Sequence, residues 1–264
     1  MLATPENTTE IAATGARPLV ALRGVGKVYS GGVEAVRDVD FDVSDGEIVS
    51  LLGPSGCGKT TILSMLAGLI EPTQGTIAWV DPRDRDDLSI VLQDATLMPW
   101  ATVEDNVWLP FRLKGRSRAS VADAIHAMLR GVGMEGFERA FPRELSGGMR
   151  MRVAVARALV TRPRLLLMDE PFAALDEITR FRLNDDLLAL RREVGCTVVF
   201  VTHSVFESVF LSDRILVMGH RPGRIVEELG VRPTVPRDQA FRTSAEYAAH
   251  CRTASDSLAG AMAR

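Results

Sequence analysis

The residues best suited to phosphate chemistry form one octet, Gly53-Pro54-Ser55-Gly56-Cys57-Gly58-Lys59-Thr60. Glycines let successive backbone N–H groups face one anion, and a helix N-terminus adds positive potential. In this motif the lysine, Lys59, reaches the β- and γ-phosphates, and the hydroxyl of Thr60 binds Mg²⁺. The motif requires a strand before it and a helix after it, and the apolar runs 47–52 and 61–67 supply both. We therefore predict a loop that binds a nucleoside triphosphate.

Other polar positions follow apolar runs typical of buried strands: Gln93 after 88–92, Asp169 and Glu170 after 164–168, and His203 after 196–202. Open α/β sheets place their ligand-contacting groups at the carboxyl ends of strands. One carboxylate can position Mg²⁺, and the adjacent one can accept a proton from an attacking water. We predict functional roles for Asp169 and Glu170 and a γ-phosphate contact for His203. Gln93 alone is equally compatible with an ordinary loop position.

A second glycine-rich turn, Ser146-Gly147-Gly148, stands before the apolar-periodic segment 150–160. Serine and glycine at a helix N-terminus satisfy free N–H groups and can also receive an anion. One triphosphate needs only one such loop, so the second turn needs an explanation beyond helix capping. Tyr29, upstream of the octet, fits two interpretations equally: stacking on an adenine ring, or half-burial in a strand.

The elements that must position these residues predict an α/β fold. Residues 19–43 alternate apolar and polar positions between glycines, which is typical of antiparallel strands. The octet and the strand-end residues then require a sheet whose strands alternate with helices. Residues 1–18 are polar and small without an apolar core, which predicts a disordered tail rather than a secretory signal.

A helical insertion interrupts this pattern over about residues 95–160, where strand alternation gives way to helical spacing. Its entrance, 97–100, is apolar although it lies in a loop, which fits either a partner surface or a buried anchor. A hairpin and a helix complete the chain over about 213–264. In that last helix we expect four apolar residues to pack inward: Ala248, Cys251, Leu258 and Met262.

The composition argues against several classes of protein. The formal net charge of −3 gives no reason to expect nucleic-acid binding. No apolar run reaches the roughly 18 residues of a membrane span. The cysteines Cys57, Cys196 and Cys251 are scattered without metal-ligand spacing, which favours a reduced, cytosolic compartment. Cys57 lies inside the octet, where its backbone matters more than its thiol.

In this order, the motifs resemble the ATP-binding subunit of ABC transporters. The match covers that family's A-loop, Walker A, Q-loop, signature, Walker B, D-loop and H-loop, at Tyr29, Gly53–Thr61, Gln93, Leu145–Met149, Leu167–Pro171, Ala174–Asp176 and His203. Only Met149 departs mildly, because glutamine is commoner there. The resemblance implies a P-loop NTPase (RecA-like) core with an N-terminal antiparallel β subdomain and a helical insertion subdomain. Residues 19–264 would form this ATP-binding domain.

The resemblance also implies a role for each motif residue. ATP would be held by Tyr29, Gly53, Pro54, Ser55, Gly56, Cys57, Gly58, Lys59, Thr60, Thr61 and Asp176. Thr60, Gln93 and Asp169 would serve Mg²⁺. Glu170 would be the general base on the attacking water, and His203 would contact the γ-phosphate.

The same resemblance explains the second glycine-rich turn. In this family two copies of the subunit pair head to tail, and each ATP lies between the Walker A loop of one chain and the signature of the other. Ser146, Gly147 and Gly148 would therefore contact the ATP held by a second copy of the protein.

A finer resemblance, to the nitrate/sulfonate/taurine branch of bacterial importers, rests on Leu97–Trp100, Asp105–Val107 and Arg221–Ile225. It implies a membrane permease contacted through the Gln93–Trp100 region, and a periplasmic or extracellular solute-binding protein that acts indirectly. The subunit would lie peripherally on the cytoplasmic face of the bacterial inner membrane. The solute would be nitrate, a sulfonate, taurine or a related small molecule.

Three alternatives differ in class. A soluble ABC-type ATPase of DNA repair or translation would usually carry coiled-coil insertions, zinc-binding cysteines or tandem cassettes, and the sequence has none. An ATP-binding scaffold without hydrolysis conflicts with the intact Lys59, Asp169, Glu170 and His203. An exporter partner is the remaining alternative within transport.

Overall fold

The N-terminal part of the chain forms a small antiparallel sheet. In the computed structural model, which describes residues 18–85 and 87–263, this sheet has the order β2-β1-β4. Its strands are β1 (Pro18–Val28), β2 (Glu34–Ser44) and β4 (Gln74–Trp79). The predicted antiparallel strands are therefore confirmed. The predicted tail lies outside the described residues, except that Pro18 already begins β1.

The second sheet has six strands in the order β5-β6-β7-β3-β8-β9. Its strands are β3 (Ile48–Leu52), β5 (Leu88–Val91), β6 (Leu165–Asp169), β7 (Thr197–Thr202), β8 (Arg214–Met218) and β9 (Ile225–Gly230). The first five in this order are parallel, and β9 pairs antiparallel with β8. Every residue of β3, β6 and β7 is buried, as expected when helices cover both faces of a parallel sheet. The strand-end residues therefore meet at one edge.

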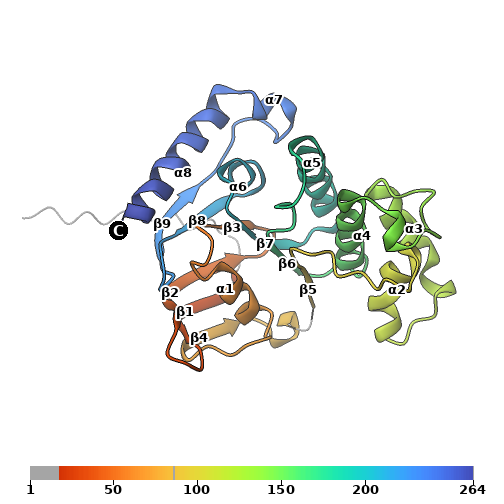
Figure 1. Cartoon of the computed structure of the whole chain (residues 1–264), viewed down its shortest axis with the longest axis horizontal. Helices are drawn as coiled ribbons and strands as arrows, with labels where there is room; N and C mark the ends of the chain where they lie inside the picture. Colours follow the sequence, from red (N-terminus) through yellow and green to blue (C-terminus); the bar gives the residue numbers. More distant parts are fainter. Residues whose placement is uncertain (1–17, 86, 264) are drawn as a thin grey trace, which may run out of the picture.

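Helix α1 (Lys59–Leu66) lies between the two sheets (Figure 1). Its apolar face joins one hydrophobic core with both sheets, as shown by Ile62 beside Leu22 of β1 and Val199 of β7 in one buried cluster. The opposite face of the six-stranded sheet packs against α5 (Glu177–Val194) and α6 (Val205–Leu211). The octet is thus held between two packed layers.

The helices of the predicted insertion project from one side of the sheets (Figure 1). They comprise α2 (Val103–Leu113), α3 (Ala122–Gly131) and α4 (Gly147–Leu159), with short 3₁₀ turns η2 (Ala119–Val121) and η3 (Pro142–Glu144). A further turn, η1 (Pro82–Arg85), precedes β5. The fold class predicted from the motifs is confirmed: an α/β core with an antiparallel sheet and a helical insertion.

The C-terminal helix α8 (Ala245–Ala263) follows the short α7 (Gln239–Arg242) and packs on α6. Its inward residues are Tyr247, Cys251, Ala254, Leu258 and Ala261. The prediction was right for Cys251 and Leu258 and wrong for Ala248 and Met262, which are exposed. Small residues occur all around this helix, so periodicity alone does not define its buried stripe. Across the described ranges, no helix is long and apolar enough to span a membrane.

Candidate nucleotide site

One pocket, of about 360 Å³, brings most of the predicted site residues together at the carboxyl edge of the large sheet. Its lining comprises Tyr29, Val33, Ala35, Ser55, Gly56, Gly58, Lys59, Thr60, Thr61, Gln93, Asp169, Glu170 and Arg221. These residues come from the turn after β1, the start of β2, the octet and the start of α1, the segment after β5, the end of β6 and the turn after β8. The parallel strand order explains why residues so distant in sequence meet there.

The octet has the backbone geometry of an anion-binding loop. Gly58 has φ +100°, and a Cβ there would approach the Ala35 carbonyl oxygen to 2.7 Å, so only glycine fits. No side chain caps the α1 N-terminus, which leaves its N–H groups available to a ligand. Lys59 is buried, and its Nζ donates to the carbonyls of Gly53 (2.8 Å) and Pro54 (2.9 Å). The ammonium is therefore fixed inside the loop.

Two carboxylates stand against this loop. The Thr60 hydroxyl donates to Asp169 Oδ1 at 3.1 Å, and Lys59 Nζ lies 3.4 Å from Glu170 Oε1. Burial raises the pKa of Asp169 above its ordinary value, because removing a carboxylate from water disfavours its charged form. A nearby cation would reverse that effect. The oxygens of Thr60, Asp169 and Gln93 are ligands of the type that Mg²⁺ prefers.

Glu170 has a strained backbone, with φ +43° in a region that non-glycine residues rarely adopt. Such conformations cost about 1–3 kcal/mol and persist only where the surroundings determine them. Here they turn the side chain toward both Lys59 and His203, whose Nδ1 lies 3.0 Å from Glu170 Oε2. The strain therefore coincides with the group predicted to act as a base.

Tyr29 lies in the turn just after β1, with 42% of its surface exposed. Its hydroxyl is 3.3 Å from Oγ1 of Thr61, the third residue of α1. The ring therefore borders the pocket rather than packing inside a strand, which favours the stacking interpretation over half-burial.

The second glycine-rich turn lies elsewhere in the chain. Ser146 caps α4 by accepting from the Met149 N–H at 3.3 Å, and Asp176 caps α5 by accepting from Thr179 N at 2.9 Å. A Cβ on Gly148 would lie 2.8 Å from Thr179 Cγ2, so the two helix starts are neighbours. None of these five residues lines the nucleotide pocket, and Gly147 does not line it either. The structure does not bring the two glycine-rich turns together within one chain.

Two residues of the β8–β9 turn support the pocket, and the sequence reasoning missed their roles. A Cβ on Gly223 would lie only 1.9 Å from the Cys57 carbonyl oxygen, so this glycine lets the turn touch the octet. Arg221 lines the pocket, with Nη2 3.4 Å from the Gly56 carbonyl oxygen. A glycine flanked by proline and arginine marks a turn, but its contact with the octet depends on pairing that the local sequence does not encode.

Glu207 was also missed. It is buried, its Oε2 accepts from the Thr202 hydroxyl at 2.5 Å, and its Oε1 is 3.6 Å from Arg180 Nε. Arg180 Nη2 in turn donates to the Leu175 carbonyl at 2.9 Å. This network joins the strand that precedes His203 to the loop that precedes Asp176. A charged residue within the apolar stretch 205–211 was the available signal.

Comparison with known proteins assigns the chain to a family. The ABC transporter family model matches residues 36–173. These include the octet, the second glycine-rich turn (Ser146–Gly148, hereafter the signature turn) and the carboxylates of Asp169 and Glu170. The chain belongs to the ABC transporter ATP-binding family, and it is an ATP-binding, ATP-hydrolysing protein.

Two relatives and one solved structure illustrate the similarity. The aliphatic sulfonates import ATP-binding protein SsuB 1 of Pseudomonas savastanoi pv. phaseolicola is 43% identical over 84% of this chain and 89% of its own length. The taurine import ATP-binding protein TauB of Shigella sonnei is 40% identical over 75% of this chain and 79% of its own. The dimeric, ADP- and Pi-bound ATP-binding cassette MJ0796 superposes with a TM-score of 0.71 at 32% identity, covering 81% of this chain and all of that one.

Proposed function

We propose that the chain is the ATP-hydrolysing subunit of an importer and works as a head-to-tail dimer. The observation that carries this proposal is the separation of the two anion-binding turns. The octet lines a pocket, whereas Ser146–Gly148 caps an exposed helix start away from that pocket. A second copy in the opposite orientation would place its Ser146–Gly148 over the octet. The similar cassette MJ0796, dimeric with ADP and Pi bound, supports this arrangement.

Each pocket residue then has a task in hydrolysis. Lys59 and the octet amides hold the β- and γ-phosphates, and Tyr29 stacks on the base. Glu170 accepts a proton from the water whose oxygen attacks the γ-phosphorus, while the bond to the ADP oxygen breaks. His203, next to Glu170 at 3.0 Å, contacts the γ-phosphate. Asp176 serves the same site from the start of α5 in the dimer.

The oxygen donors in the pocket fit a Mg²⁺ ion. Thr60, Gln93 and Asp169 would hold it, and the Thr60–Asp169 contact of 3.1 Å shows that two of these donors already converge. When bound, the ion neutralises charge on the phosphates. Because phosphoryl transfer depends mainly on positioning and charge, these fixed donors supply most of what the reaction needs.

The importer role is supported by the relatives named for sulfonate and taurine import. We propose that a sulfonate, taurine, nitrate or a related small solute is carried by a permease, with a periplasmic or extracellular binding protein acting indirectly. These import relatives favour this function over repair, translation or export. The chain would sit peripherally on the cytoplasmic face of the bacterial inner membrane.

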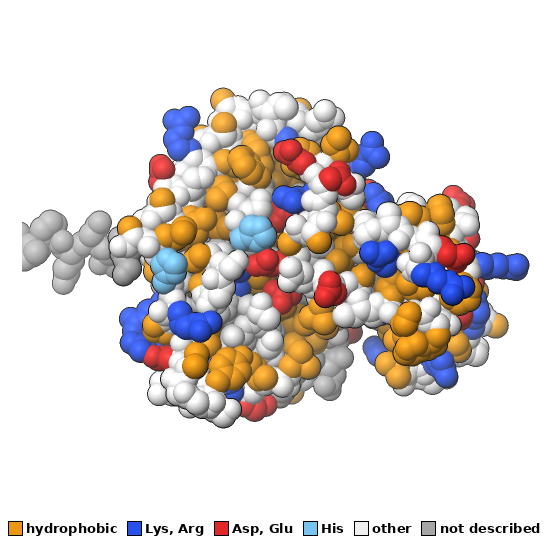
Figure 2. Space-filling view, in the orientation of Figure 1, with side chains coloured by type: hydrophobic (Ala, Val, Ile, Leu, Met, Phe, Trp, Pro, Cys, Tyr) orange, Lys and Arg blue, Asp and Glu red, His pale blue; other side chains and the backbone are white. Residues whose placement is uncertain are grey.

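The proposed permease contact is the Gln93–Trp100 region, and the loop that follows Gln93 and Asp94, residues 95–101, is hereafter the docking loop. Trp100 is 76% exposed within it, and Leu113 at the end of α2 is 80% exposed. Figure 2 shows hydrophobic side chains gathered over α2. Exposed aromatic residues of this kind are frequent anchors in protein interfaces. The space-filling view also shows positive and negative side chains interspersed.

A complementation experiment tests the head-to-tail dimer. Lys59→Ala disables the octet, and Gly147→Asp places a negative charge where the partner's phosphate would lie. The latter fits sterically, because the nearest neighbour of a Cβ at Gly147 is 3.8 Å away. Each variant alone should be inactive, and an equal mixture should recover about a quarter of the wild-type ATPase rate, because half of the random dimers hold one intact site of two.

No recovery on mixing, with both variants folded and able to dimerise, would exclude the head-to-tail arrangement. The permease contact is tested separately with Trp100→Ala, which should weaken capture by a purified candidate permease of a sulfonate or taurine importer by about tenfold. Leu69→Ala, an exposed leucine on the core with 67% of its surface accessible, is the matched control. Equal capture by the two variants would disprove the contact.

A further inference from the structure

Two side chains of the helical subdomain bind the docking loop by hydrogen bonds near its two ends, and each set of bonds is called a grip below. The first is Arg157 of α4. Its Nη1 donates to the Thr96 carbonyl at 3.0 Å, and its Nη2 donates to the Ala95 carbonyl at 3.0 Å and to Thr96 Oγ1 at 3.2 Å. No carboxylate pairs with Arg157 among residues 18–85 and 87–263. Both terminal nitrogens of this guanidinium therefore donate to the loop rather than to an acid.

The loop segment that Arg157 grips is strained. Thr96 has φ +43°, a left-handed conformation that a β-branched residue rarely adopts. Such a residue holds its conformation only when neighbouring groups determine it. The three hydrogen bonds from Arg157 surround this residue and supply that constraint. Arg157 therefore determines the conformation of the loop, because Thr96 would leave its left-handed conformation without these bonds.

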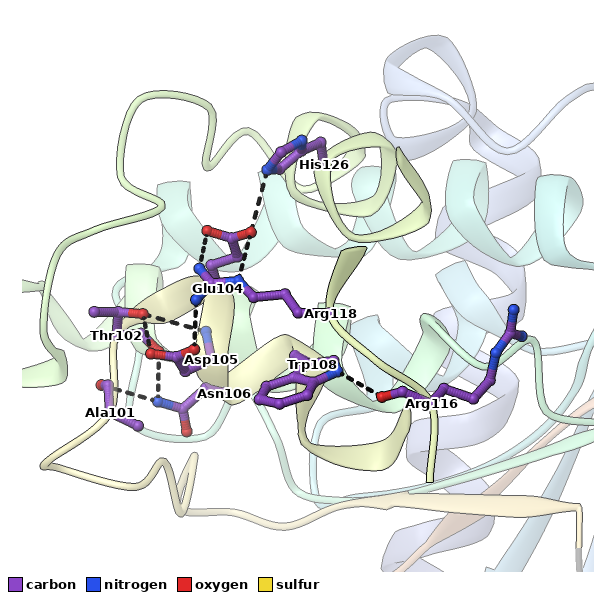
Figure 3. A network of polar contacts seen from close by, with 9 residues as sticks. All are labelled: Ala101, Thr102, Glu104, Asp105, Asn106, Trp108, Arg116, Arg118 and His126. Atoms are coloured by element: carbon purple, nitrogen blue, oxygen red, sulfur yellow. Dashed lines mark hydrogen bonds and ion pairs between the residues drawn. The ribbon is translucent and has the colours of Figure 1, made fainter. Parts of the chain in front are cut away.

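The second grip comes from Asn106 of α2, which is fully buried. Its Oδ1 accepts from the Met98 N–H at 2.8 Å, and its Nδ2 donates to the carbonyls of Met98 (3.2 Å), Ala101 (3.2 Å) and Thr102 (2.9 Å). Figure 3 shows the amide directed at Ala101 and Thr102, beneath the exposed network of Glu104, Arg118 and His126. Both polar atoms of a buried amide are satisfied by the loop.

Trp100 lies between these two grips and is free of both. The two helices that supply the grips, α2 and α4, pack on one another, and Val107 of α2 and Val153 of α4 are buried in the same hydrophobic core. Helix α4 begins at Gly147, in the signature turn. The docking loop, α2, α4 and the signature turn therefore share one packed unit, whereas Gln93 lines the nucleotide pocket two residues before the loop.

We infer that Asn106 and Arg157 are positioning residues that fasten the docking loop to the helix of the signature turn. This inference rests on the proposed permease contact and adds to it the two residues that fix the position of Trp100 relative to α4. Neither residue touches nucleotide, so their effect reaches the reaction only through the loop and α4.

Distance measurements between spin labels on the full chain test this inference without a permease. The three native cysteines are buried, so labels can be directed to Trp100→Cys and Arg130→Cys, the latter exposed on α3. With both grips intact we expect a narrow distribution of label distances that MgATP leaves in place. Asn106→Ala and Arg157→Lys should each broaden it, and the double variant should broaden it further.

Arg118→Ala is the matched control, because it removes the exposed ion pairs to Glu104 and Asp105 while leaving both grips intact. Amide exchange gives a second reading: Met98 should exchange about fivefold to tenfold faster in Asn106→Ala, which corresponds to one lost hydrogen bond. If Asn106→Ala does not fold, Arg157→Lys decides the question, because lysine retains the charge but not the fork.

Distributions as narrow in the grip variants as in Arg118→Ala would overturn the inference. Failure of the permease contact would leave these distances unaffected and would appear only as unchanged capture of Trp100→Ala. The two hypotheses therefore fail in different experiments.

Discussion

The two glycine-rich turns of this chain stand before helices in similar ways but have different surroundings. The octet before α1 encloses a buried lysine, faces two carboxylates and is pressed by the β8–β9 turn at Gly223. The signature turn before α4 is capped by its own Ser146 and approaches α5 only at Gly148, whereas a Cβ at Gly147 would meet nothing closer than 3.8 Å. The octet is packed on several sides, and the signature turn is exposed at Ser146 and Gly147.

This difference indicates that a helix N-terminus becomes a binding site only when neighbouring groups add charge, burial and fixed geometry. A free helix start offers an anion about 0.3–1 kcal/mol when exposed, which is too little to hold a triphosphate. The octet adds charge, burial and fixed geometry within one chain. The signature turn has none of these within its own chain, so its contribution must come where another chain supplies the remainder of the site.

The largest expected effect concerns ATP hydrolysis in the pocket of the octet. Glu170→Gln removes the proton acceptor but preserves shape, and should reduce phosphate release by about 10²–10⁴-fold. ATP binding, measured by titration calorimetry, should persist, because the octet is unchanged. Glu177→Gln, at the start of α5, is the control. A Glu170→Gln protein that hydrolyses ATP at the wild-type rate would remove Glu170 from the base role.

A second effect concerns binding by the octet alone. Lys59→Ala removes a charged donor from the loop and should weaken ATP affinity by about 10- to 100-fold, the usual size of a charge-assisted hydrogen bond. Equilibrium dialysis at concentrations that keep the protein monomeric measures it. Lys114→Ala, an exposed lysine at the end of α2, is the control. If the two variants bound ATP equally, the octet would not be the primary site.

The packing contrast predicts opposite effects of one methyl group. Gly223→Ala forces a Cβ against the Cys57 carbonyl and should lower the free energy of unfolding by about 1–3 kcal/mol. Gly147→Ala has room and gains helix propensity, so it should be neutral or stabilising by up to about 1 kcal/mol. Urea unfolding compares them. Similar values for the two would show that the octet is not packed as described.

The smallest expected effect concerns the buried carboxyl group of Glu207, next to the end of β7. Burial raises the pKa of Glu207 above 4.5, so the folded chain keeps this proton to higher pH than the unfolded chain. Its contribution to stability is present below 4.5 and is lost as pH rises through the folded pKa. Glu207→Gln stays neutral, so its free energy of unfolding should rise relative to wild type over that window, by at most about 1.4 kcal/mol per pH unit.

Thermal and urea unfolding across this pH range provide the measurement, with Glu177→Gln as the exposed counterpart. A difference between Glu207→Gln and wild type that stays constant with pH would show that Glu207 has the same affinity for its proton in both states.

The motif residues were predictable because their chemistry is local. The octet, the strand ends at Asp169 and His203, and the signature turn each follow from a short pattern with a physical reason. What escaped prediction depends on distant pairing. The contact of Gly223 with Cys57, the Glu207–Arg180 pair, and the placement of β7 between β3 and β6 join segments separated by many residues. Buried stripes made of small residues, as in α8, also lack a clear periodic signal.

The contact between Gly223 and the octet has a consequence for synthesis of the protein. The octet leaves the ribosome long before the β8–β9 turn that supports it, and domains fold progressively from the N-terminus. The contact between Gly223 and the octet therefore cannot form until residues 213–230 have emerged and paired with β3. A nascent chain that ends before this hairpin lacks this support and should bind nucleotide more weakly than the finished chain.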